Sequence, residues 1–170
     1  MKDNAFNVLW LQSGGCGGCT MSLLCADTQD FAGMWRSAGI ELLWHPSLSL
    51  ETGDEMVSIL NDCLQGRTRL DALCIEGSML RGPNGTGRFH MLAGTGRAMI
   101  DWVRDLAEVA EYTLGIGTCA AYGGITAAGN NPTDACGLQY DGHRLGGLLG
   151  ADYRSRRGLP RSEEHTSELQ

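Results

Sequence analysis

The sequence has no long hydrophobic run and few basic residues. No stretch of its 170 residues approaches the roughly 18 consecutive apolar residues that a membrane-spanning helix needs, and the mean hydropathy is −0.16. Thirteen Lys and Arg stand against twenty Asp and Glu, so the net charge is −7. A protein that binds nucleic acid presents clustered positive charge to the phosphates. We therefore expect neither a membrane span nor a nucleic-acid partner.

Two marks of a secreted protein are also missing. Residues 1–7 lead directly into an apolar segment, without the charged and apolar regions of a signal peptide. The seven cysteines are an odd number, so they cannot all pair with one another in disulfides. A leaderless chain that contains Cys-x-x-Cys more often uses it for metal or redox chemistry than for a structural disulfide. We therefore expect a cytoplasmic protein.

The composition predicts a folded domain with many loops. Hydrophobic residues make up 42% of the chain and charged residues 19%, which is enough apolar surface for a core. The length leaves room for one domain. There are 25 glycines, a number that favours a scaffold with many tight loops around a cofactor over a helical bundle.

Apolar segments alternate with amphipathic ones along the chain. We expect strands near residues 7–12, 40–45, 70–76 and 112–116, and helices near residues 21–36, 53–65 and 98–111. Thr52 and Glu55 have the spacing of a capping box before the second helix. Residues 123–160 are rich in glycine and polar residues, and we expect them to be mostly irregular. Strands separated by helices predict an α/β fold with an open, doubly wound parallel sheet.

Three cysteines and one acidic residue stand at expected strand ends. Cys16 and Cys19 follow the first strand, Glu76 ends the third, and Cys119 follows the fourth. In a doubly wound sheet such residues gather at the carboxyl edge. Soft thiolates between glycines suit an iron–sulfur cluster, whose sulfides accept hydrogen bonds from the backbone. Glu76 could donate to a cluster or buffer it, or it could cap a loop.

Other readings of Cys16-Gly-Gly-Cys19 remain open at this point. A strand followed by Cys-x-x-Cys and a helix is also the order of a thioredoxin-like dithiol. Half of a zinc site is a further alternative, although no second Cys-x-x-Cys or His pair follows at zinc-finger spacing. The segment 82–89 imitates a phosphate-binding loop, but Arg88 and Phe89 stand where Lys and Ser or Thr are needed. We therefore exclude nucleotide hydrolysis.

The remaining cysteines and the histidines of the body have structural interpretations. Free cysteine in a helix or a buried strand behaves as a small apolar residue, which is our prediction for Cys25, Cys63 and Cys74. His45, His90 and His143 are scattered, and we predict hydrogen-bonded loop histidines.

Three motifs, taken in order, resemble the N-terminal domain of nickel–iron hydrogenase small subunits. They are Cys16-Gly-Gly-Cys19, Glu76-Gly-Ser78 and Gly117-Thr-Cys119-Ala-Ala-Tyr-Gly-Gly-Ile125. The similarity extends from about Asn7 to Pro160. It implies a flavodoxin-like domain that holds a proximal 4Fe-4S cluster, next to a separate large subunit that carries nickel and iron. It implies Cys16, Cys19 and Cys119 as three ligands of this cluster and no catalytic residue on the chain.

The chain departs from this family near its end. The fourth proximal ligand of the family lies in a Gly-Cys-Pro motif that is missing here, and the resemblance does not place a ligand at Cys136. Residues 161–170 have no apolar period and read like a translated sequencing adapter. We therefore expect an incomplete domain at 1–160, truncated before the C-terminal cluster domain, and an artefact tail at 161–170.

The leaderless start and residues 131–143 resemble the cytoplasmic regulatory members of the family. Those members sense dihydrogen and pass the signal to a sensor histidine kinase. One alternative is the small subunit of a catalytic cytoplasmic uptake hydrogenase. A more distant one is the related quinone-reductase small subunit, whose motif begins with adjacent cysteines that this chain lacks.

Overall fold

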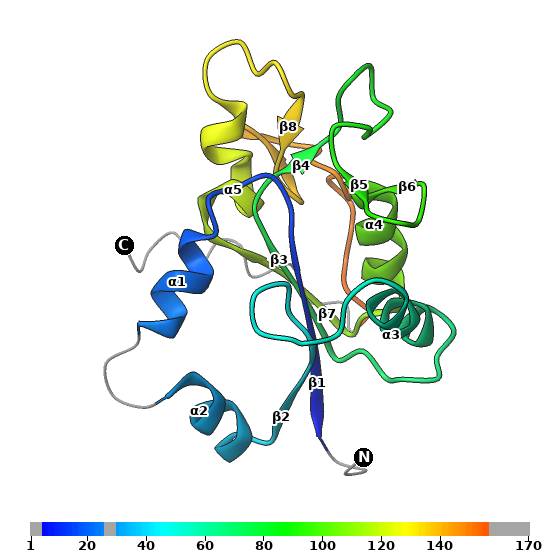
Figure 1. Cartoon of the computed structure of the whole chain (residues 1–170). Helices are drawn as coiled ribbons and strands as arrows, with labels where there is room; N and C mark the ends of the chain where they lie inside the picture. The colour runs from blue at the N-terminus through cyan, green and yellow to red at the C-terminus, as the bar shows by residue number, and fades with distance from the viewer. Residues whose placement is uncertain (1–4, 26–29, 157–170) are drawn as a thin grey trace.

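A parallel sheet of four strands forms the centre of the molecule (Figure 1). The structure is a computed structural model that describes residues 5–25 and 30–156. In spatial order, the strands are β2 (Ile40–Trp44), β1 (Phe6–Gln12), β3 (Ala72–Glu76) and β7 (Tyr112–Ile116). This is the flavodoxin-like order, in which the chain reverses direction across the sheet between β1 and β3. The predicted fold class is confirmed. The expected boundary at residue 160 and the tail at 161–170 lie outside the described residues.

Helices cover both faces of the sheet (Figure 1). On one face lie α3 (Asp54–Leu64) and α4 (Met99–Val109), whose apolar sides pack against Leu73 and Ile75 of β3. On the other face lie α1 (Gly18–Leu24) and α2 (Phe31–Ser37), beside Val8 and Trp10 of β1. Every residue of β3 is buried, as expected for a strand at the centre of a parallel sheet.

The helix expected over residues 21–36 is two shorter helices. A new N-terminus forms at Asp30, whose side chain accepts a hydrogen bond of 2.6 Å from the N–H of Gly33. This side chain satisfies a helix-end donor, and a helix can therefore begin there. The prediction of a single helix is wrong. The apolar residues between 21 and 36 are irregularly spaced because they belong to two helices.

The capping box expected before α3 does not form. The N-cap of α3 is Gly53, with φ +56°, and no side chain caps this helix end. Thr52 contributes only its carbonyl oxygen, which accepts a hydrogen bond of 3.2 Å from the N–H of Glu55. Because Gly53 is the N-cap, Thr52 lies one residue before the position from which a side chain caps a helix.

After α5 (Gly117–Tyr122), the chain is mostly irregular, as predicted. The 3-10 helix η1 (Gly124–Ala127) follows α5. Two-residue strands from this segment and from the chain before α5 form short pairs. They are β4 (Met79–Leu80) with β8 (Ala135–Cys136), β5 (Met91–Leu92) with β6 (Arg97–Ala98), and β9 (Tyr140–Asp141) with β10 (Arg144–Leu145).

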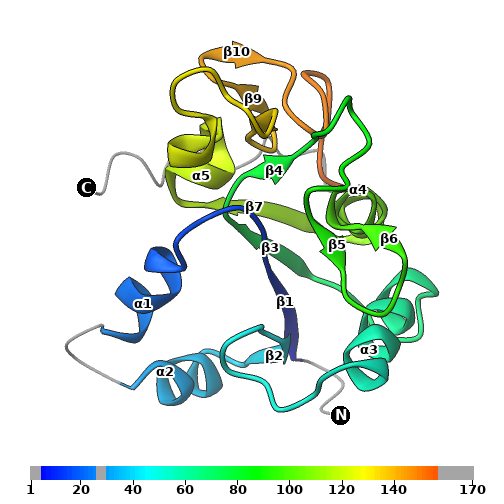
Figure 2. The same ribbon diagram turned by 45° about the horizontal axis from the view of Figure 1, so that its top comes forward.

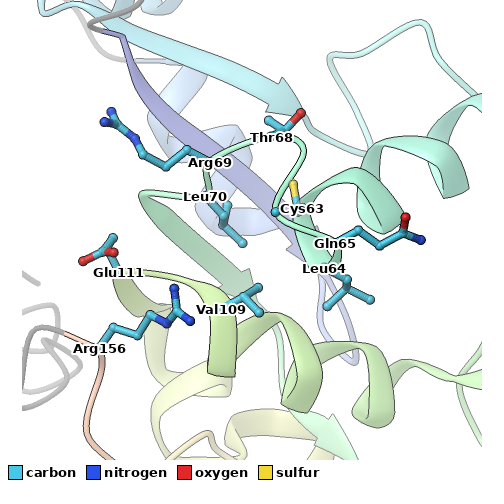
Figure 3. A pocket seen from close by; sticks show the side chains of 10 residues that line it. Cys63, Leu64, Gln65, Thr68, Arg69, Leu70, Val109, Glu111 and Arg156 are labelled. Atoms are coloured by element: carbon cyan, nitrogen blue, oxygen red, sulfur yellow. The ribbon is translucent and has the colours of Figure 1, made fainter.

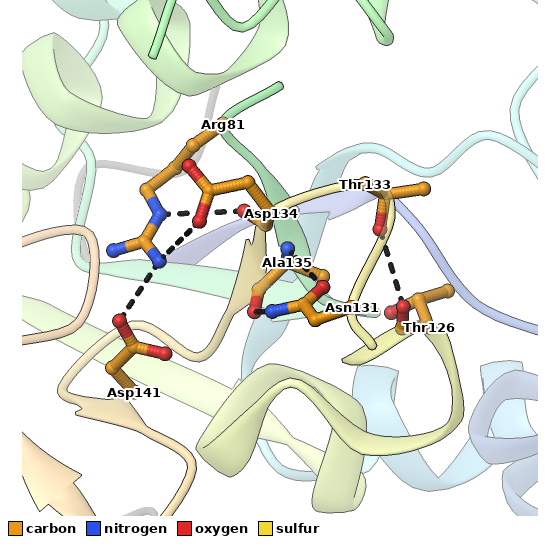
Figure 4. A network of polar contacts seen from close by, with 7 residues as sticks. All are labelled: Arg81, Thr126, Asn131, Thr133, Asp134, Ala135 and Asp141. Atoms are coloured by element: carbon orange, nitrogen blue, oxygen red, sulfur yellow. Dashed lines mark hydrogen bonds and ion pairs between the residues drawn. The ribbon is translucent and has the colours of Figure 1, made fainter. Parts of the chain in front are cut away.

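Arg81 ties this irregular segment to the end of β4. Its guanidinium donates to Asp134 at 2.7 Å and to Asp141 at 2.8 Å (Figure 4). Asn131 supports the same turn, because its side chain accepts from the N–H of Ala135 at 2.7 Å and donates to the carbonyl of that residue at 2.9 Å. One half-buried cation thus joins Asp134, in a loop, to Asp141 of β9.

Replacing Arg81 with Met should lower the free energy of unfolding by about 1–2 kcal/mol, between the values for exposed and buried ion pairs. The Arg81 side chain is only 23% exposed, and its loss leaves two neighbouring carboxylates without their shared cation. Urea unfolding measures this change. Arg104→Met is the control, since Arg104 makes one exposed pair with Asp101 and should change stability by less than about 0.5 kcal/mol. Equal effects of the two substitutions would contradict the assignment.

Candidate functional site

All four strands deliver residues to the carboxyl edge of the sheet. Gln12, Glu76 and Ile116 lie side by side in register at the ends of β1, β3 and β7. The connection from β1 to α1 passes over this edge, next to α5 (Figure 2). His45 follows the end of β2. The edge where the sequence places the cysteines is therefore assembled from segments that lie far apart in the chain.

The loops after β1 and β3 are joined by backbone hydrogen bonds. The N–H of Gly14 donates to the carbonyl of Ser78 at 3.0 Å, and the N–H of Ser78 donates to the carbonyl of Gly14 at 2.7 Å. Between them, Gly77 has φ +88°, and a Cβ there would lie 2.9 Å from the backbone carbon of Ser13. Only glycine fits so close an approach. The Cys16 loop is thus held directly above the end of β3.

The buried carboxylate of Glu76 accepts hydrogen bonds from five donors. Its Oε1 accepts from the N–H groups of Cys19 and Thr20, each at 3.1 Å. Its Oε2 accepts from Gln12 Nε2 at 2.9 Å, from Trp10 Nε1 at 3.3 Å and from the Thr20 hydroxyl. Glu76 therefore caps the first turn of α1 from the neighbouring strand.

These contacts determine the charge of Glu76. Burial raises the pKa of its carboxyl, but hydrogen bonds from Thr20, Gln12 and Trp10 outweigh burial and lower that pKa below its ordinary value. A carboxylate that accepts several N–H and O–H bonds is stabilised in its ionised form. The contacts of Glu76 are with the first turn of α1 and with β1, whereas the sequence analysis considered the capping of a loop. A direct effect on a bound cluster stays a prediction.

Cys16, Cys19 and Cys119 lie in one electrostatic neighbourhood. Burial raises the pKa of the Cys19 thiol, and the nearby Glu76, Cys119 and Cys16 raise it further. Cys16 is exposed, whereas Cys19 and Cys119 are half-buried. The structure thus brings the three predicted ligands together.

Glycine backbone lines this group of thiols. A Cβ at Gly117 would collide with the sulfur of Cys19, and one at Gly124 would collide with the sulfur of Cys119. Cys119 itself lies in α5 and Cys19 in the first turn of α1, so only Cys16 of the three is on a loop. We call these three cysteines, with Gly117 and Gly124, the cysteine rim.

The geometry of the cysteine rim differs from a site for one metal ion. Among residues 5–25 and 30–156, no three His, Cys, Asp or Glu side chains converge on a single point. In a 4Fe-4S cluster each thiolate ligand binds a different iron atom, so its ligands need not converge in this way. A soft thiolate set beside bare glycine backbone fits such a cluster.

Residues 16–157 match the family described as NADH ubiquinone oxidoreductase, 20 Kd subunit. The match covers most of the chain and includes every cysteine of the rim. The chain belongs to this family.

The chain is similar in sequence to curated proteins that are small subunits of hydrogenases. It is 34% identical to the Hydrogenase-2 small chain of Escherichia coli K12, over 78% of this chain and 34% of the relative. It is 31% identical to the periplasmic [NiFeSe] hydrogenase small subunit of Desulfomicrobium baculatum, over 74% of this chain and 42% of the relative. The chain thus spans between about a third and two-fifths of the length of these relatives.

Solved hydrogenases share the fold. The actinobacterial-type NiFe-hydrogenase of Ralstonia eutropha H16 superposes with a TM-score of 0.75 at 30% identity, covering 92% of this chain and 47% of that one. The reduced Ni-Fe-Se hydrogenase of Desulfomicrobium baculatum superposes with a TM-score of 0.69 at 28% identity, covering 79% of this chain and 50% of that one. The similarity to hydrogenase small subunits extends over about half of each solved chain.

Three further cysteines of the chain are buried and are not part of the cysteine rim. Burial raises the pKa of Cys63 to about 11, that of Cys74 to about 12 and that of Cys136 to about 11. The predicted apolar role of Cys63 and Cys74 is confirmed by their burial. Cys136 is fully buried in the core and pairs with Met79 between β8 and β4, so we do not assign it as a substitute fourth ligand. Cys25 is exposed at the end of α1, and its predicted apolar role is wrong.

His45 and His90 are hydrogen-bonded histidines outside helices and strands, as predicted, but their place beside the candidate site was not predicted. His45 is completely buried, and its Nε2 lies 3.3 Å from the hydroxyl of Thr20. His90 contacts Ser13, with 3.1 Å between Nδ1 and the hydroxyl, and burial lowers the pKa of its ring. The position of His45 after a strand end was the available signal, because the same rule selected the cysteines.

A pocket of about 390 Å³ lies at the opposite edge of the sheet, near the amino ends of β3 and β7 (Figure 3). Cys63, Arg69, Glu111 and Arg156 are among the residues that line it. None of the cysteines of the rim lines it. It is therefore separate from the candidate site.

Replacing Glu76 with Gln should lower the free energy of unfolding by about 2–3 kcal/mol. The amide has one oxygen in place of two, so its NH₂ group would face hydrogen-bond donors that the carboxylate now satisfies. Urea unfolding of the two proteins measures the difference. The matched control is Glu41→Gln on the exposed side of β2, with an expected change below about 0.5 kcal/mol. Equal unfolding midpoints for wild type and Glu76→Gln would contradict this assignment.

The rate of alkylation should differ between exposed and buried cysteines. At pH 8 we expect iodoacetamide to modify Cys16 and Cys25, which are exposed, and to spare Cys63, Cys74 and Cys136 until the protein is unfolded. The reason is that the thiolate is the nucleophile and burial keeps these three thiols protonated. Mass spectrometry of the peptides gives each rate. Native-state modification of Cys74 as fast as that of Cys25 would refute the placement.

Proposed function

We propose that the chain is the electron-transferring small subunit of a nickel–iron hydrogenase. In this proposal Cys16, Cys19 and Cys119 hold the proximal 4Fe-4S cluster. The observation that carries it is the gathering of these three thiols at one glycine-lined edge. The hydrogenase small subunits among the relatives support the same assignment.

The residues around the cysteine rim have distinct tasks in this proposal. When bound, the cluster supplies one-electron transfer. The three thiolates ligate it, and Gly117 and Gly124 leave its neighbourhood free of side chains. Glu76 holds the N–H of Cys19 and thereby the start of α1. No catalytic residue is assigned to this chain, because dihydrogen chemistry belongs to the nickel–iron site of the large subunit.

A protein partner at the carboxyl edge is consistent with the surface there. Ile125 follows Gly124 directly and is 74% exposed, and Phe89 lies in the loop after β4 and is 52% exposed. Contiguous exposed apolar patches mark interaction sites on protein surfaces. We propose that the large subunit covers this edge and excludes water from the cluster. The described part of the chain contains no helix that is both long and apolar enough to span a bilayer.

The finer proposal is a dihydrogen-sensing complex in the cytoplasm that signals to a sensor histidine kinase. It rests on the resemblance of residues 131–143, which Arg81 holds through Asp134 and Asp141. The alternative is the small subunit of a catalytic cytoplasmic uptake hydrogenase. The relatives include proteins with periplasmic and quinone-reactive hydrogenase names, and these names do not distinguish the two proposals. The more distant alternative, a quinone-reductase small subunit, is supported by the description of the family as an NADH ubiquinone oxidoreductase subunit.

Anaerobic reconstitution of the 170-residue chain with iron, sulfide and a small thiol tests cluster binding. The small thiol can supply a fourth ligand, because the proposal assigns three cysteines to the cluster. We expect visible absorption of an iron–sulfur cluster in the wild type and its loss in Cys16→Ser, Cys19→Ser and Cys119→Ser. Cys25→Ser and Cys63→Ser are the controls and should keep it. A wild type without a cluster, or a control that loses it, would overturn the ligand assignment.

A second measurement separates sensing from catalysis. The chain is co-expressed and co-purified with a nickel–iron hydrogenase large subunit, and dihydrogen is added with and without a sensor kinase. In the sensing proposal, dihydrogen changes the rate of kinase autophosphorylation at least twofold. Unchanged autophosphorylation together with rapid reduction of a soluble dye by dihydrogen would favour the uptake alternative.

A further inference from the structure

His45 connects the end of β2 to the cysteine rim through buried contacts. Its ring lies against that of Trp10, with 5.2 Å between the ring centroids, and its backbone N–H donates to the Ser49 hydroxyl at 2.9 Å. The carbonyl of His45 accepts from the N–H of Ser49 at 3.0 Å. The backbone and the ring of this histidine are therefore both held in place.

The contacts of His45 select one tautomer. The N–H of Ser47 donates to Nδ1 at 3.0 Å, so Nδ1 must present its lone pair and carries no proton. In a neutral imidazole the proton is then on Nε2, which faces the hydroxyl of Thr20 at 3.3 Å. His45 is therefore the donor in its contact with Thr20.

The Thr20 hydroxyl uses all of its hydrogen-bonding capacity. It accepts from His45 Nε2 and from Gln12 Nε2, the latter at 3.0 Å, and it donates its only proton to Glu76. A hydroxyl has one proton to donate and two lone pairs to accept with. Since both lone pairs are occupied by N–H donors, the proton of Thr20 must be directed at the carboxylate of Glu76.

We propose that His45 and Thr20 are positioning residues for Cys19. The hydrogen bonds run in one direction, from the Ser47 turn through His45 and Thr20 to Glu76, and the opposite oxygen of that carboxylate holds the N–H of Cys19. The β2 turn thus determines how Glu76 is oriented and where Cys19 is held. The consequence for a cluster rests on the proposed function, whereas the positioning itself is a property of the chain.

If His45 had a purely structural role, its ring would only fill space in the core beside Trp10. The two roles respond differently to three substitutions. His45→Phe keeps an aromatic ring against Trp10 and removes the Nε2 donor. Thr20→Val keeps the shape of the side chain and removes the hydroxyl, and Thr20→Ser keeps the hydroxyl.

Amide hydrogen exchange in the 170-residue chain distinguishes these roles. In Thr20→Val and His45→Phe we expect the amides of Cys19 and residue 20 to exchange roughly tenfold or more faster than in the wild type, as for the loss of a hydrogen bond to a charged group. The core amide of Leu73 is the internal control and should exchange at the wild-type rate. Thr20→Ser should restore slow exchange to within about threefold of the wild type, because it keeps the proton that Glu76 accepts.

Imidazole nitrogen chemical shifts of His45 provide a spectroscopic readout that core packing does not predict. We expect the pattern of the Nε2–H tautomer in the wild type and in Thr20→Ser. A proton on Nδ1, or unchanged exchange of the Cys19 amide in both Thr20→Val and His45→Phe, would overturn the proposal. If His45→Phe fails to fold, the Val and Ser variants of Thr20 decide between the two roles.

The cluster reconstitution described above separates this inference from the proposed function. In one outcome, the chain shows slow exchange of the Cys19 amide that depends on the Thr20 hydroxyl and yet binds no cluster. This result would support the positioning role and refute the proposed cluster binding. The opposite outcome is also informative. If the chain binds a cluster but the Cys19 amide exchanges at the wild-type rate in both Thr20→Val and His45→Phe, only the positioning role is refuted.

Discussion

The carboxylate of Glu76 is the interaction on which the candidate site depends. It lies at the end of the central strand, and its donors come from the neighbouring strand and from the first turn of α1. An ionised carboxylate is costly to bury unless it is well hydrogen-bonded. Its five donors offset that cost, and their convergence holds Cys19 and the start of α1 at the edge of the sheet.

The parallel sheet explains why the remaining parts meet at this edge. Parallel strands with crossover helices bring all of their carboxyl ends to one side. The thiols of Cys16, Cys19 and Cys119 therefore come together although a hundred residues separate the last from the others. Glycine at positions 77, 117 and 124 then allows the backbone segments and the sulfurs to approach more closely than any Cβ would permit.

The contacts at this edge also show how buried polar groups support a reactive surface. Thr20, His45 and Glu76 are each almost fully buried, yet each has hydrogen-bond partners. Such a network specifies one arrangement, because an unpaired member would be costly. The exposed Cys16 and the half-buried Cys19 are thereby presented on a rigid support, which is the condition for a precise binding site.

The fold class, the four strands and the edge of the sheet where the cysteines lie were predictable from the sequence. Runs such as residues 70–76 are apolar enough to be strands, Glu76 ends such a run, and Cys16 and Cys119 follow strand ends within a few residues. Other features became apparent only in the folded structure: Asp30 starts a second helix, Cys25 is exposed, and His45 contacts Thr20 beside the cysteine rim. These outcomes depend on contacts between distant segments. The donors that stabilise a buried carboxylate, and the direction of each hydrogen bond, exist only after the strands have paired.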